Sequence, residues 1–591
     1  MRLEHDYPRP QLRRPDWTSL NGRWKFQFDD EGRLSRPADT SVWPLTIEVP
    51  FPPESAASGI ADTGYHFACW YEREFYISPS DKHVLLHFGA VDYAAWVWVN
   101  GKLVVTHEGG HTPFSADITF ALKEGTQQTV TVLAKDDPLD LTKPRGKQDW
   151  QLEPHSIWYP RTTGIWQTVW LERVASTFIS KIRWTPCIED YSLQFEARIG
   201  GEPLDGLTID LSLRHGKRVL AQDSYAVIDR ESDRRIIISD PGIEDYRNEL
   251  LWSPERPTLL QAHICLRRGE QVLDSFDSYT ALRSIQVMRD RFMLNGRPYP
   301  LRLVLDQGYW PDTLMAAPND AALKKDVELA KAMGFNGVRK HQKIEDPRYL
   351  YWADQLGLLV WEEMPSAYRF TRTAIKRLVR EWGEAIERDF SHPCIIAWVP
   401  YNESWGVPEL PNIQAHRHAV EALYHLTKTL DPTRPVIGND GWESGATDII
   451  GIHDYDSPAR IVDRYGKSSS EELFDRRRPG GRVLTLDGYP HRGQPIMLTE
   501  FGGIAYSPRK GRKGAKNWGY AKVSTANEFR ACYQDLLAAV NDSLLLSGFC
   551  YTQFADTFQE VNGLLYADRT PKFPLAEICK ATYIVPKYTP G

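Results

Sequence analysis

From about residue 284 onward the chain repeats the order strand, loop, helix, and this alternation restricts the fold more than any other feature. Short apolar runs predict eight strands, at 302–305, 337–339, 358–361, 395–399, 436–438, 449–451, 496–498 and 548–551. Helices are predicted between most of them, at 319–334, 346–356, 373–390, 411–430 and 525–541. The pattern therefore predicts a (β/α)8 TIM barrel, with 454–494 inserted as a loop on its active face.

The preceding residues are predicted to be all β. Between 17 and 174, short alternating strands are separated by turn signals, and Asn100-Gly101 marks a tight hairpin, which is typical of a jelly-roll sandwich. The short strands from 175 to 283 fit an immunoglobulin-like β-sandwich. Since 591 residues exceed what one core organises, we predict a multidomain chain divided at 1–174, 175–283 and 284–591.

The charge and composition of the chain exclude several classes of binding partner. The net charge of −7, without a long basic stripe, argues against nucleic acid. The start lacks the apolar core of a signal peptide, and no run is long enough to span a membrane. The seven cysteines are scattered, as free thiols in a reducing cytoplasm would be. We expect a cytoplasmic protein without a membrane partner, and a homo-oligomer is compatible with the sequence.

Two of the predicted strands end in a glutamate. Glu403 follows the run 395–399, and Glu500 follows 496–498. Because the active sites of such barrels lie at the carboxyl ends of the strands, both side chains should point into one cleft. One glutamate at a strand end is more often structural, but a pair on the fourth and seventh strands favours catalysis. Two carboxylates in one cleft are what cleavage of a glycosidic bond requires.

The surroundings of the two glutamates predict different roles. Glu403 lies between Tyr401 and Trp405 after an apolar strand, a setting that raises a carboxyl pKa and suits a proton donor. Glu500 is expected beside arginine and tyrosine side chains, which would keep it ionised as a nucleophile. Asn402, just before Glu403, is placed to donate a hydrogen bond to a sugar hydroxyl.

Several segments resemble glycoside hydrolase family 2, in the family's order along nearly the whole chain. They are GIWQTVWL (164–171), FMLNG (292–296), GFNGVRKH (334–341), WVPYNESWG (398–406) and TEFGG (499–503). The resemblance implies a retaining exo-glycosidase in which Glu403 is the acid/base and Glu500 the nucleophile. It implies an oligosaccharide or glycoside substrate, and a chemistry that requires no metal or other cofactor.

Residues at other strand ends are candidates for binding the sugar. Their positions predict that Arg339 and His341 brace Glu500 or tie a barrel layer, and that His453 and Tyr455 touch sugar hydroxyls. Many family members carry a histidine where Asp306 and Gln307 follow the first strand, so this departure predicts an altered subsite. The remaining candidates are the aromatic platforms Trp442 and Tyr551, whose alternative is plain packing, and the polar residues Gln553 and Asp556.

The identity of the sugar is the least constrained prediction. The family's β-glucuronidases carry Asn-x-Lys before a Gly-x-x-x-x-Asp-Arg-x-Pro-Lys stretch, which is present here as GLLYADRTPK (563–572). The residues before it are Glu560-Val561-Asn562, so the lysine for a uronate carboxylate is missing. We expect the substrate to be a β-galactoside, with an α-L-arabinoside or a β-galactofuranoside as alternatives. A β-glucuronide ranks after these, and a mannoside is less favoured.

Two other classes of protein compete with a glycosidase. A non-catalytic carbohydrate-binding protein with an inactive barrel would not need both Glu403 and Glu500. A metallohydrolase is disfavoured because His416 and His418 are two apart on a predicted helix and face apart, and no His-Glu-x-x-His run occurs.

Overall fold

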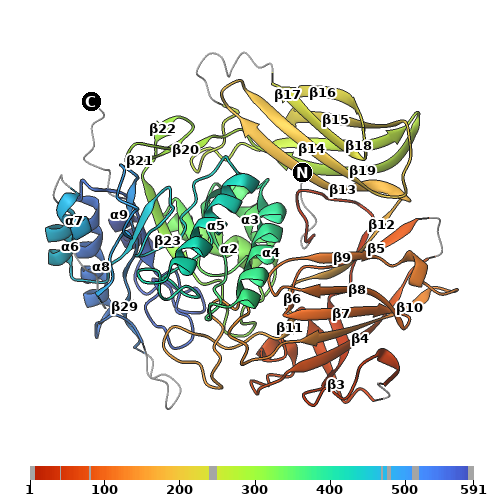
Figure 1. The fold of residues 1–591 in the computed structure, drawn as a ribbon, viewed down its shortest axis with the longest axis horizontal. Helices are drawn as coiled ribbons and strands as arrows, with labels where there is room; N and C mark the ends of the chain where they lie inside the picture. The colour runs from red at the N-terminus through yellow and green to blue at the C-terminus, as the bar shows by residue number, and fades with distance from the viewer. Residues whose placement is uncertain are drawn as a thin grey trace.

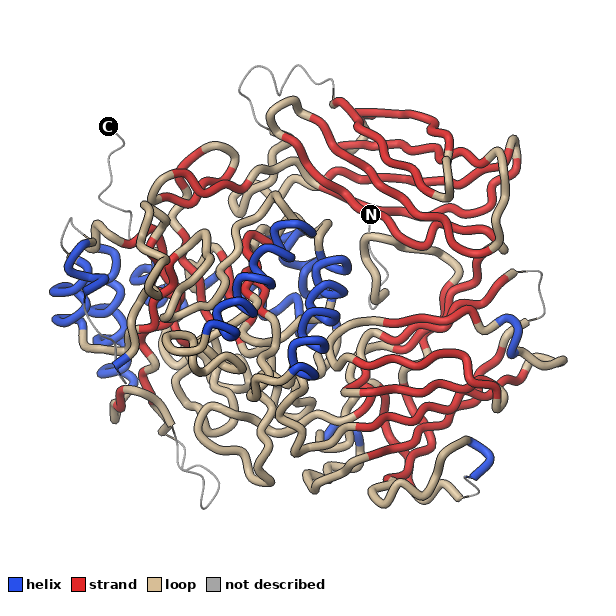
Figure 2. Tube along the Cα trace, in the orientation of Figure 1, coloured by secondary structure: helices blue, strands red, loops and turns tan. Residues whose placement is uncertain are grey.

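The computed structural model describes residues 7–39, 42–78, 82–238, 249–466, 470–475, 481–508 and 518–583. Two β-sandwiches and a helix-covered barrel lie side by side (Figure 1). The first sandwich is at the lower right of the view, the second at the upper right, and the barrel at the left. Strands dominate the right side of the same view and helices gather around the barrel (Figure 2). The predicted division at 174 falls between β12 and β13, and that at 283 between β19 and β20.

The first sandwich consists of antiparallel sheets, as predicted. A four-stranded sheet has the order β1-β12-β5-β9 and a six-stranded sheet the order β3-β2-β4-β10-β7-β8, with β11 and β6 forming a small pair. Asn100 and Gly101 have φ of +50° and +80° between β7 and β8, so the predicted hairpin is confirmed. The strands are β1 (Trp17–Ser19), β2 (Gly22–Phe28), β3 (Leu45–Val49), β4 (Ala68–Tyr76), β5 (His83–Phe88), β6 (Val91–Asp92), β7 (Ala94–Val99), β8 (Lys102–Glu108), β9 (Phe114–Asp117), β10 (Gln127–Lys135), β11 (Gly164–Ile165) and β12 (Val169–Val174).

The second sandwich pairs a three-stranded sheet, β13-β14-β17, with a four-stranded sheet, β16-β15-β18-β19. Its inward-facing positions form a core of their own, because apolar residues alternate with polar ones along the strands. The strands are β13 (Thr177–Cys187), β14 (Ser192–Gly201), β15 (Leu207–His215), β16 (Arg218–Ala226), β17 (Glu231–Ile237), β18 (Leu260–Arg268) and β19 (Gln271–Thr280).

A three-stranded meander, β20 (Ile285–Met288), β21 (Arg291–Leu294) and β22 (Arg297–Pro298), leads into the barrel. The barrel sheet is parallel and has the order β26-β25-β24-β23-β31-β28-β27. Its strands are β23 (Leu301–Asp306), β24 (Gly337–Lys340), β25 (Leu359–Glu363), β26 (Ile395–Val399), β27 (Ile450–His453), β28 (Ile496–Gly502) and β31 (Leu546–Thr552).

The predicted fifth strand, 436–438, is not a regular strand in the structure. It reaches β26 through isolated bridges, Trp398 to Val436 and Asn402 to Asp440, and the Trp398 amide donates to the Pro435 carbonyl at 3.2 Å. The segment therefore sits where the fifth strand of the barrel belongs, without the ladder that defines a strand.

Helices cover the barrel, as expected for parallel strands buried on both faces. Asn319 caps the first of them by accepting from the Ala322 amide, and Gly334 follows its end at φ +86°, as predicted. The region 454–494 was predicted as a loop but contributes two helices, one of which packs against α8. The helices are α2 (Asp320–Ala332), α3 (Pro347–Leu356), α4 (Arg372–Asp389), α5 (Gln414–Leu430), α6 (Pro458–Tyr465), α7 (Glu471–Asp475), α8 (Ala526–Asn541) and α9 (Leu575–Thr582).

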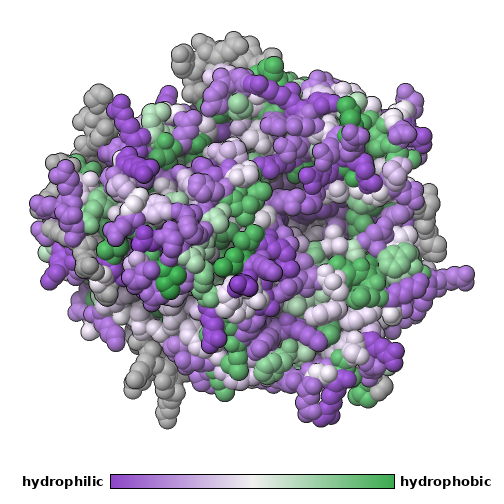
Figure 3. All heavy atoms as spheres, in the orientation of Figure 1, coloured by the Kyte–Doolittle hydropathy of each residue, from purple (hydrophilic) through white to green (hydrophobic). Residues whose placement is uncertain are grey.

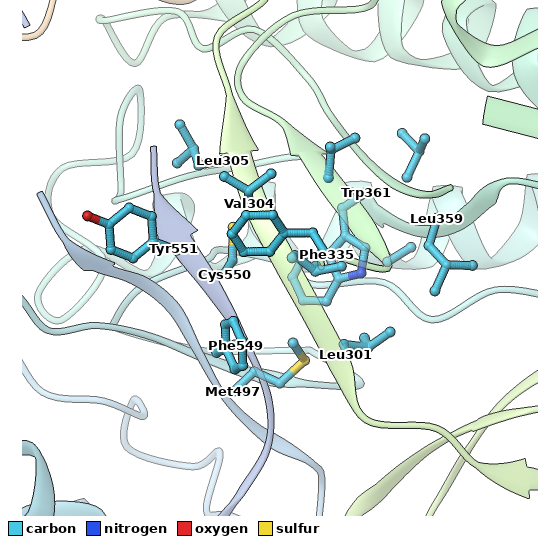
Figure 4. Close-up of a cluster of buried hydrophobic side chains, with 14 of the residues drawn as sticks. Leu301, Val304, Leu305, Phe335, Leu359, Trp361, Met497, Phe549, Cys550 and Tyr551 are labelled. Atoms are coloured by element: carbon cyan, nitrogen blue, oxygen red, sulfur yellow. The ribbon is translucent and has the colours of Figure 1, made fainter. Parts of the chain in front are cut away.

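Apolar side chains divide into one large cluster in the barrel and one in each sandwich. Figure 4 shows part of the barrel cluster, to which β23 contributes Val304, β28 Met497 and β31 Phe549. The face seen in Figure 3 is correspondingly mostly hydrophilic. All seven cysteines are free thiols. Among the helices that the structure describes, none has the length and apolar character needed to cross a membrane.

Candidate active site

Both predicted glutamates lie at the carboxyl end of the barrel. Glu403 stands on the turn after β26, where it and Ser404 have φ of +52° and +59°, a region that costs a non-glycine residue about 1 kcal/mol or more. The turn is held by the fifth segment, because the Glu403 amide donates to the Asp440 carbonyl at 2.9 Å and the Ser404 amide to Asn439 Oδ1 at 2.9 Å. The irregular segment thus fixes the direction of the Glu403 side chain.

The two carboxylates are close enough to act on one bond. Glu403 and Glu500 each offer an oxygen within 4.8 Å of the other. Their side chains are 13% and 7% exposed, so both are accessible from a largely dry site. Retaining glycosidases place their carboxyl groups about 5–5.5 Å apart, whereas inverting enzymes need about 6.5–9.5 Å to admit a water. Oxygens this close fit the shorter, retaining spacing better than the wider, inverting one.

His453 lies between the two glutamates. Its Nδ1 is 2.7 Å from Glu403 Oε1, and its Nε2 is 3.4 Å from Glu500 Oε1 and 3.3 Å from Asp440 Oδ2. Burial lowers the pKa of His453, but the carboxylates of Glu500, Asp440 and Glu403 outweigh it and raise the pKa to about 9. The imidazole is thus an internal cation at neutral pH.

This cation changes the electrostatics that the sequence predicted for the two glutamates. Burial raises the pKa of Glu403, but the hydrogen bond and charge of His453 outweigh burial, so its pKa is lowered rather than raised. The pKa of Glu500 is raised by burial and by Glu403, against the opposing charges of His453 and Arg339. The prediction from neighbours in sequence was wrong here because it omitted His453, which comes from a different strand.

Arg339 on β24 braces Glu500, the nucleophile candidate. This is one of the two predicted roles for Arg339, the other being to tie a layer of the barrel. The fully buried guanidinium lies 3.2 Å from Glu500 Oε1 and 2.8 Å from Asp440 Oδ2, and it pairs with Glu363. It also donates to Asn402 Oδ1 at 2.6 Å. The planar fork of arginine suits such a set of acceptors, so one cation orients both walls of the site.

Tyr455 is directed at Glu500 rather than toward open space. Its hydroxyl donates to Glu500 Oε2 at 2.7 Å, and the Thr552 hydroxyl lies 3.2 Å from the Tyr455 oxygen, to which it can donate. The exposed ring of Tyr520 stacks on it with centroids 3.4 Å apart. Both oxygens of Glu500 thus have a donor or cation beside them.

Asn402, His341 and Trp442 border the same site. The Asn402 side chain is buried, and its Nδ2 has no partner among the described residues, which leaves a donor for a substrate hydroxyl. His341 Nδ1 lies 2.9 Å from Glu363 Oε2, so His341 acts behind Arg339 and not directly on Glu500. The half-buried Trp442 ring meets His453 edge to face at 5.5 Å.

Three other candidates point away from the glutamates or into packing. Asp306 of β23 is the register partner of Lys340 of β24, and the two side chains form an ion pair at 2.8 Å. Because Lys340 follows Arg339 along the strand, this pair lies on the opposite face of the sheet from Arg339. Tyr551 is fully buried and packs edge to face on Tyr533 of α8, so the platform prediction for it was wrong. Asp556 pairs with Lys572 at 2.7 Å and is not a free polar reader.

Gln307 and Gln553 form one buried network. Gln307 Nε2 donates to Gln553 Oε1 at 3.0 Å, and Gln553 Nε2 donates to Asn562 Oδ1 at 2.7 Å. Asn562 in turn donates to Glu560 at 3.0 Å. These amides position the loop at 560–563, and neither glutamine directly contacts Glu403 or Glu500.

The sequence reasoning missed Asp440, Glu363 and Lys147. Asp440 and Glu363 follow predicted strands, so the strand-end rule that found Glu403 would also have found them. Lys147 comes from the first sandwich; it is buried, and its charge lowers the pKa of both Glu403 and His341. No local pattern in the sequence indicates that this lysine reaches the barrel.

Lys147 is held against the barrel by its own loop. The amides of Arg145 and Gly146 donate to the Ser366 carbonyl at 3.1 and 3.0 Å. Loop 54–65 of the same sandwich lies next to this segment, where the Tyr65 hydroxyl donates to the Trp150 carbonyl at 3.0 Å. The first sandwich therefore reaches the site through the segment after β10.

Within the described part of the chain, two groups of side chains have the spacing of metal ligands. One is Glu403, His453 and Glu500, where the adjacent Arg339 supplies a positive charge already. The other is Asp354, His392 and Cys394, in which Asp354 accepts from the Tyr279 hydroxyl and the Cys394 amide and lies 2.6 Å from His392. In both groups the carboxylates already have protein partners.

Comparison with known proteins agrees with this architecture. The TIM barrel domain of the glycosyl hydrolases family 2 matches residues 285–585, and the family's sugar binding domain matches residues 28–172. The chain is 28% identical over 404 residues to the β-galactosidase of Thermoanaerobacter pseudethanolicus, covering 66% of this chain and 51% of that protein. It is 25% identical over 490 residues to the β-glucuronidase of Rattus norvegicus, covering 74% and 71%.

Solved structures share the whole fold. The β-glucuronidase of Bifidobacterium dentium superposes with a TM-score of 0.78 at 20% identity, covering 98% of this chain and 99% of that one. The β-galacturonidase of Eisenbergiella tayi gives 0.74 at 19% identity, covering 99% and 100%. The chain spans about half the length of the β-galactosidases that it matches, 51% and 55%. The domain order, the barrel and the matched family domains together show that this chain belongs to glycoside hydrolase family 2.

Proposed function

We propose that the protein is a retaining exo-glycosidase that releases a terminal neutral sugar from a β-glycoside, with a β-galactoside as the first candidate. The observation that carries the proposal is the pair Glu403 and Glu500 within 4.8 Å, supplied by two strand ends of one barrel. The family shown above is one of glycoside hydrolases, and a retaining mechanism needs this pair and no metal.

In the proposed reaction, Glu500 attacks the anomeric carbon while Glu403 protonates the oxygen of the leaving aglycone. The covalent glycosyl-enzyme then reacts with water, from which Glu403 removes a proton, so the sugar leaves with its configuration retained. Arg339 and the Tyr455 hydroxyl orient Glu500. His453 Nδ1 lies 2.7 Å from Glu403 Oε1 and the pKa of His453 is raised to about 9, so His453 can supply the proton that Glu403 passes to the aglycone oxygen.

The loop at 556–572 favours a neutral sugar over a uronic acid. Glu560 is buried and adds negative charge; its carboxylate accepts from the Tyr159 hydroxyl at 2.5 Å and from Asn562. Lys572 is occupied by Asp556 and by the Tyr506 and Val561 carbonyls, each at 2.9 Å or less. A uronate carboxylate there would meet an anion and find the nearest amine already paired.

One observation supports a uronide as the second candidate. Lys147 places an ammonium near Glu403, and relatives in fold include a β-glucuronidase and a β-galacturonidase. The α-L-arabinoside and β-galactofuranoside alternatives lose support, because Asp306, half of the departure that suggested them, is paired with Lys340.

A panel of 4-nitrophenyl glycosides tests the proposal: β-galactopyranoside, β-glucuronide, β-galacturonide, β-mannoside, α-L-arabinosides and β-galactofuranoside. We expect hydrolysis of the β-galactopyranoside, and loss of turnover on every glycoside in Glu500→Gln. Glu403→Gln should spare the first step for nitrophenyl glycosides but not for alkyl glycosides, which need the acid. Equal losses on both kinds of leaving group would contradict the assignment of Glu403. If the folded protein hydrolyses none of these glycosides, the result would favour the carbohydrate-binding alternative.

A further inference from the structure

Four half-buried aromatic side chains gather beside Glu403 and come from two domains. Trp150 and Trp158 belong to the first sandwich, and Tyr368 and Trp405 to the barrel. Their rings meet at an angle: Trp158 and Trp405 have centroids 5.6 Å apart at 74°, Tyr368 and Trp405 5.2 Å at 60°, and Trp150 and Trp158 4.8 Å at 64°. We call these four residues the aromatic cluster.

The aromatic cluster contacts the Glu403 oxygen that His453 does not. Glu403 Oε1 is 2.7 Å from His453, which in turn reaches Glu500. Glu403 Oε2 instead accepts from Trp405 Nε1 at 3.3 Å. In a double displacement the nucleophile holds the sugar, and the acid delivers its proton on the opposite, leaving-group side. The cluster therefore stands where the aglycone departs.

The polar atoms of the cluster are mostly used within the protein. Trp158 Nε1 donates to the Tyr368 hydroxyl at 2.9 Å, and this hydroxyl donates to the Gly146 carbonyl at 2.6 Å. Trp405 Nε1 is engaged by Glu403. These rings therefore offer apolar faces and edges to an incoming group, with their donors already committed. This suits a flat apolar ring better than a sugar, whose hydroxyls would need partners.

The cluster is also held in place before any substrate arrives. Gln559 Nε2 donates to the carbonyls of Trp158 and Ser156 at 2.7 and 2.9 Å, and the Tyr368 amide donates to the Leu141 carbonyl at 2.9 Å. Rings fixed from both domains lose little conformational entropy when a ligand binds, so their contacts contribute more fully to affinity.

We propose, resting on the function proposed above, that the aromatic cluster is a leaving-group subsite that selects β-glycosides with an aromatic aglycone. The subsite is built across the boundary between the first sandwich and the barrel. Its rings contact the aryl group edge to face, while Trp405 directs Glu403 toward the glycosidic oxygen.

The test compares two substrates of the sugar that the panel identifies: the 4-nitrophenyl glycoside and the glycosyl fluoride. Fluoride is too small to occupy the subsite, so its release reports on the sugar site and Glu500 alone. In Trp150→Ala and Trp158→Leu we expect kcat/KM for the nitrophenyl glycoside to fall about tenfold or more, and that for the fluoride to change less than about twofold. Trp158→Phe keeps a ring and should retain most of the preference.

The matched control is Trp96→Ala, which removes a half-buried tryptophan of β7 that packs on Lys135 away from the site. This variant should leave kcat/KM unchanged for both the nitrophenyl glycoside and the fluoride. Equal losses on both substrates, or no loss on the nitrophenyl glycoside, would overturn the subsite. A larger loss on a disaccharide of the same sugar would overturn the aromatic assignment in favour of a sugar aglycone. Failure of the unaltered protein to hydrolyse the fluoride would instead refute the proposed function.

Discussion

At the scale of single residues, the site is governed by a buried histidine that no local pattern identifies as central. His453 is flanked by Glu403, Glu500 and Asp440, and Arg339 brings a positive charge to 3.4 Å from its Nε2. Three carboxylates around two nearby cations leave the pKa values of the glutamates dependent on the charge of one imidazole.

Replacing His453 by Asn should move the pH profile in a defined direction. The imidazolium opposes the raised pKa of Glu500, so its loss raises that pKa further, and the acidic limb of kcat/KM should shift to higher pH. His263→Asn, an exposed change in the second sandwich, is the control. An acidic limb that stays in place or moves to lower pH would contradict this account.

Replacing His453 by Asn should also change how the stability of the folded protein depends on pH. The pKa of His453 is raised from 6.5 to about 9 in the folded protein. The stabilisation from its charge is therefore fully present below about pH 6.5 and is lost as the pH rises through about 9. The difference in melting temperature between the unaltered protein and His453→Asn should shrink across that window.

At the scale of elements, strand ends could be predicted and side-chain directions mostly could not. The runs before Glu403 and Glu500 identify their strands because a continuous apolar stretch bounded by turn residues is typical of a buried parallel strand. Asp306 and Tyr551 were misassigned because alternate residues of a barrel strand face opposite sides, and a one-residue difference decides between site and helix layer. The fifth segment was predicted as a strand at 436–438, and its irregularity was not foreseen because it depends on the partners it meets in other elements.

The segment after β10 gives a prediction at this scale. Gly146 has φ +59°, and a Cβ there would lie 2.4 Å from the Gln342 carbonyl oxygen and 3.2 Å from Pro365. Gly146→Ala should push the loop off the barrel, displace Lys147 and the Tyr368 contact, and lower kcat/KM about tenfold or more. The cost in stability should be about 1–3 kcal/mol.

Gly216→Ala is the matched control for the loop. Gly216 has φ +60° but nothing within 4 Å of the added Cβ, so this variant carries only the backbone cost. Kinetics and thermal unfolding of both variants separate the two effects. Equal behaviour of the two variants would contradict a tightly docked loop.

At the scale of the whole molecule, one buried arginine joins the two sandwiches. Arg14 pairs with Glu172 of β12 at 2.8 Å and with Asp274 of β19 at 2.7 Å, and it donates to the Ile179 carbonyl at 2.5 Å. The order of the domains could be predicted from the sequence, but this junction could not, since its members are about 160 and 260 positions from Arg14.

Arg14→Met should destabilise the protein by about 3–5 kcal/mol, because it leaves Asp274 buried without its cation. Calorimetry should show a lower melting temperature, while kcat and KM per folded molecule stay unchanged, since Arg14 is remote from Glu403. The exposed pair of Lys181 and Glu387 offers a control, where Lys181→Met should cost about 1 kcal/mol or less. A similar small cost for Arg14→Met would contradict its role at the junction.

The aromatic cluster, drawn half from the first sandwich and half from the barrel, bears on how such chains can diverge. A barrel that keeps Glu403 and Glu500 keeps the two reacting carboxylates whichever sandwich precedes it, whereas Trp150 and Trp158, like Lys147, would change with the exchanged segment. Recombination between relatives at the boundary after β12 would then produce a chain with the catalytic residues of one parent and the leaving-group specificity of the other.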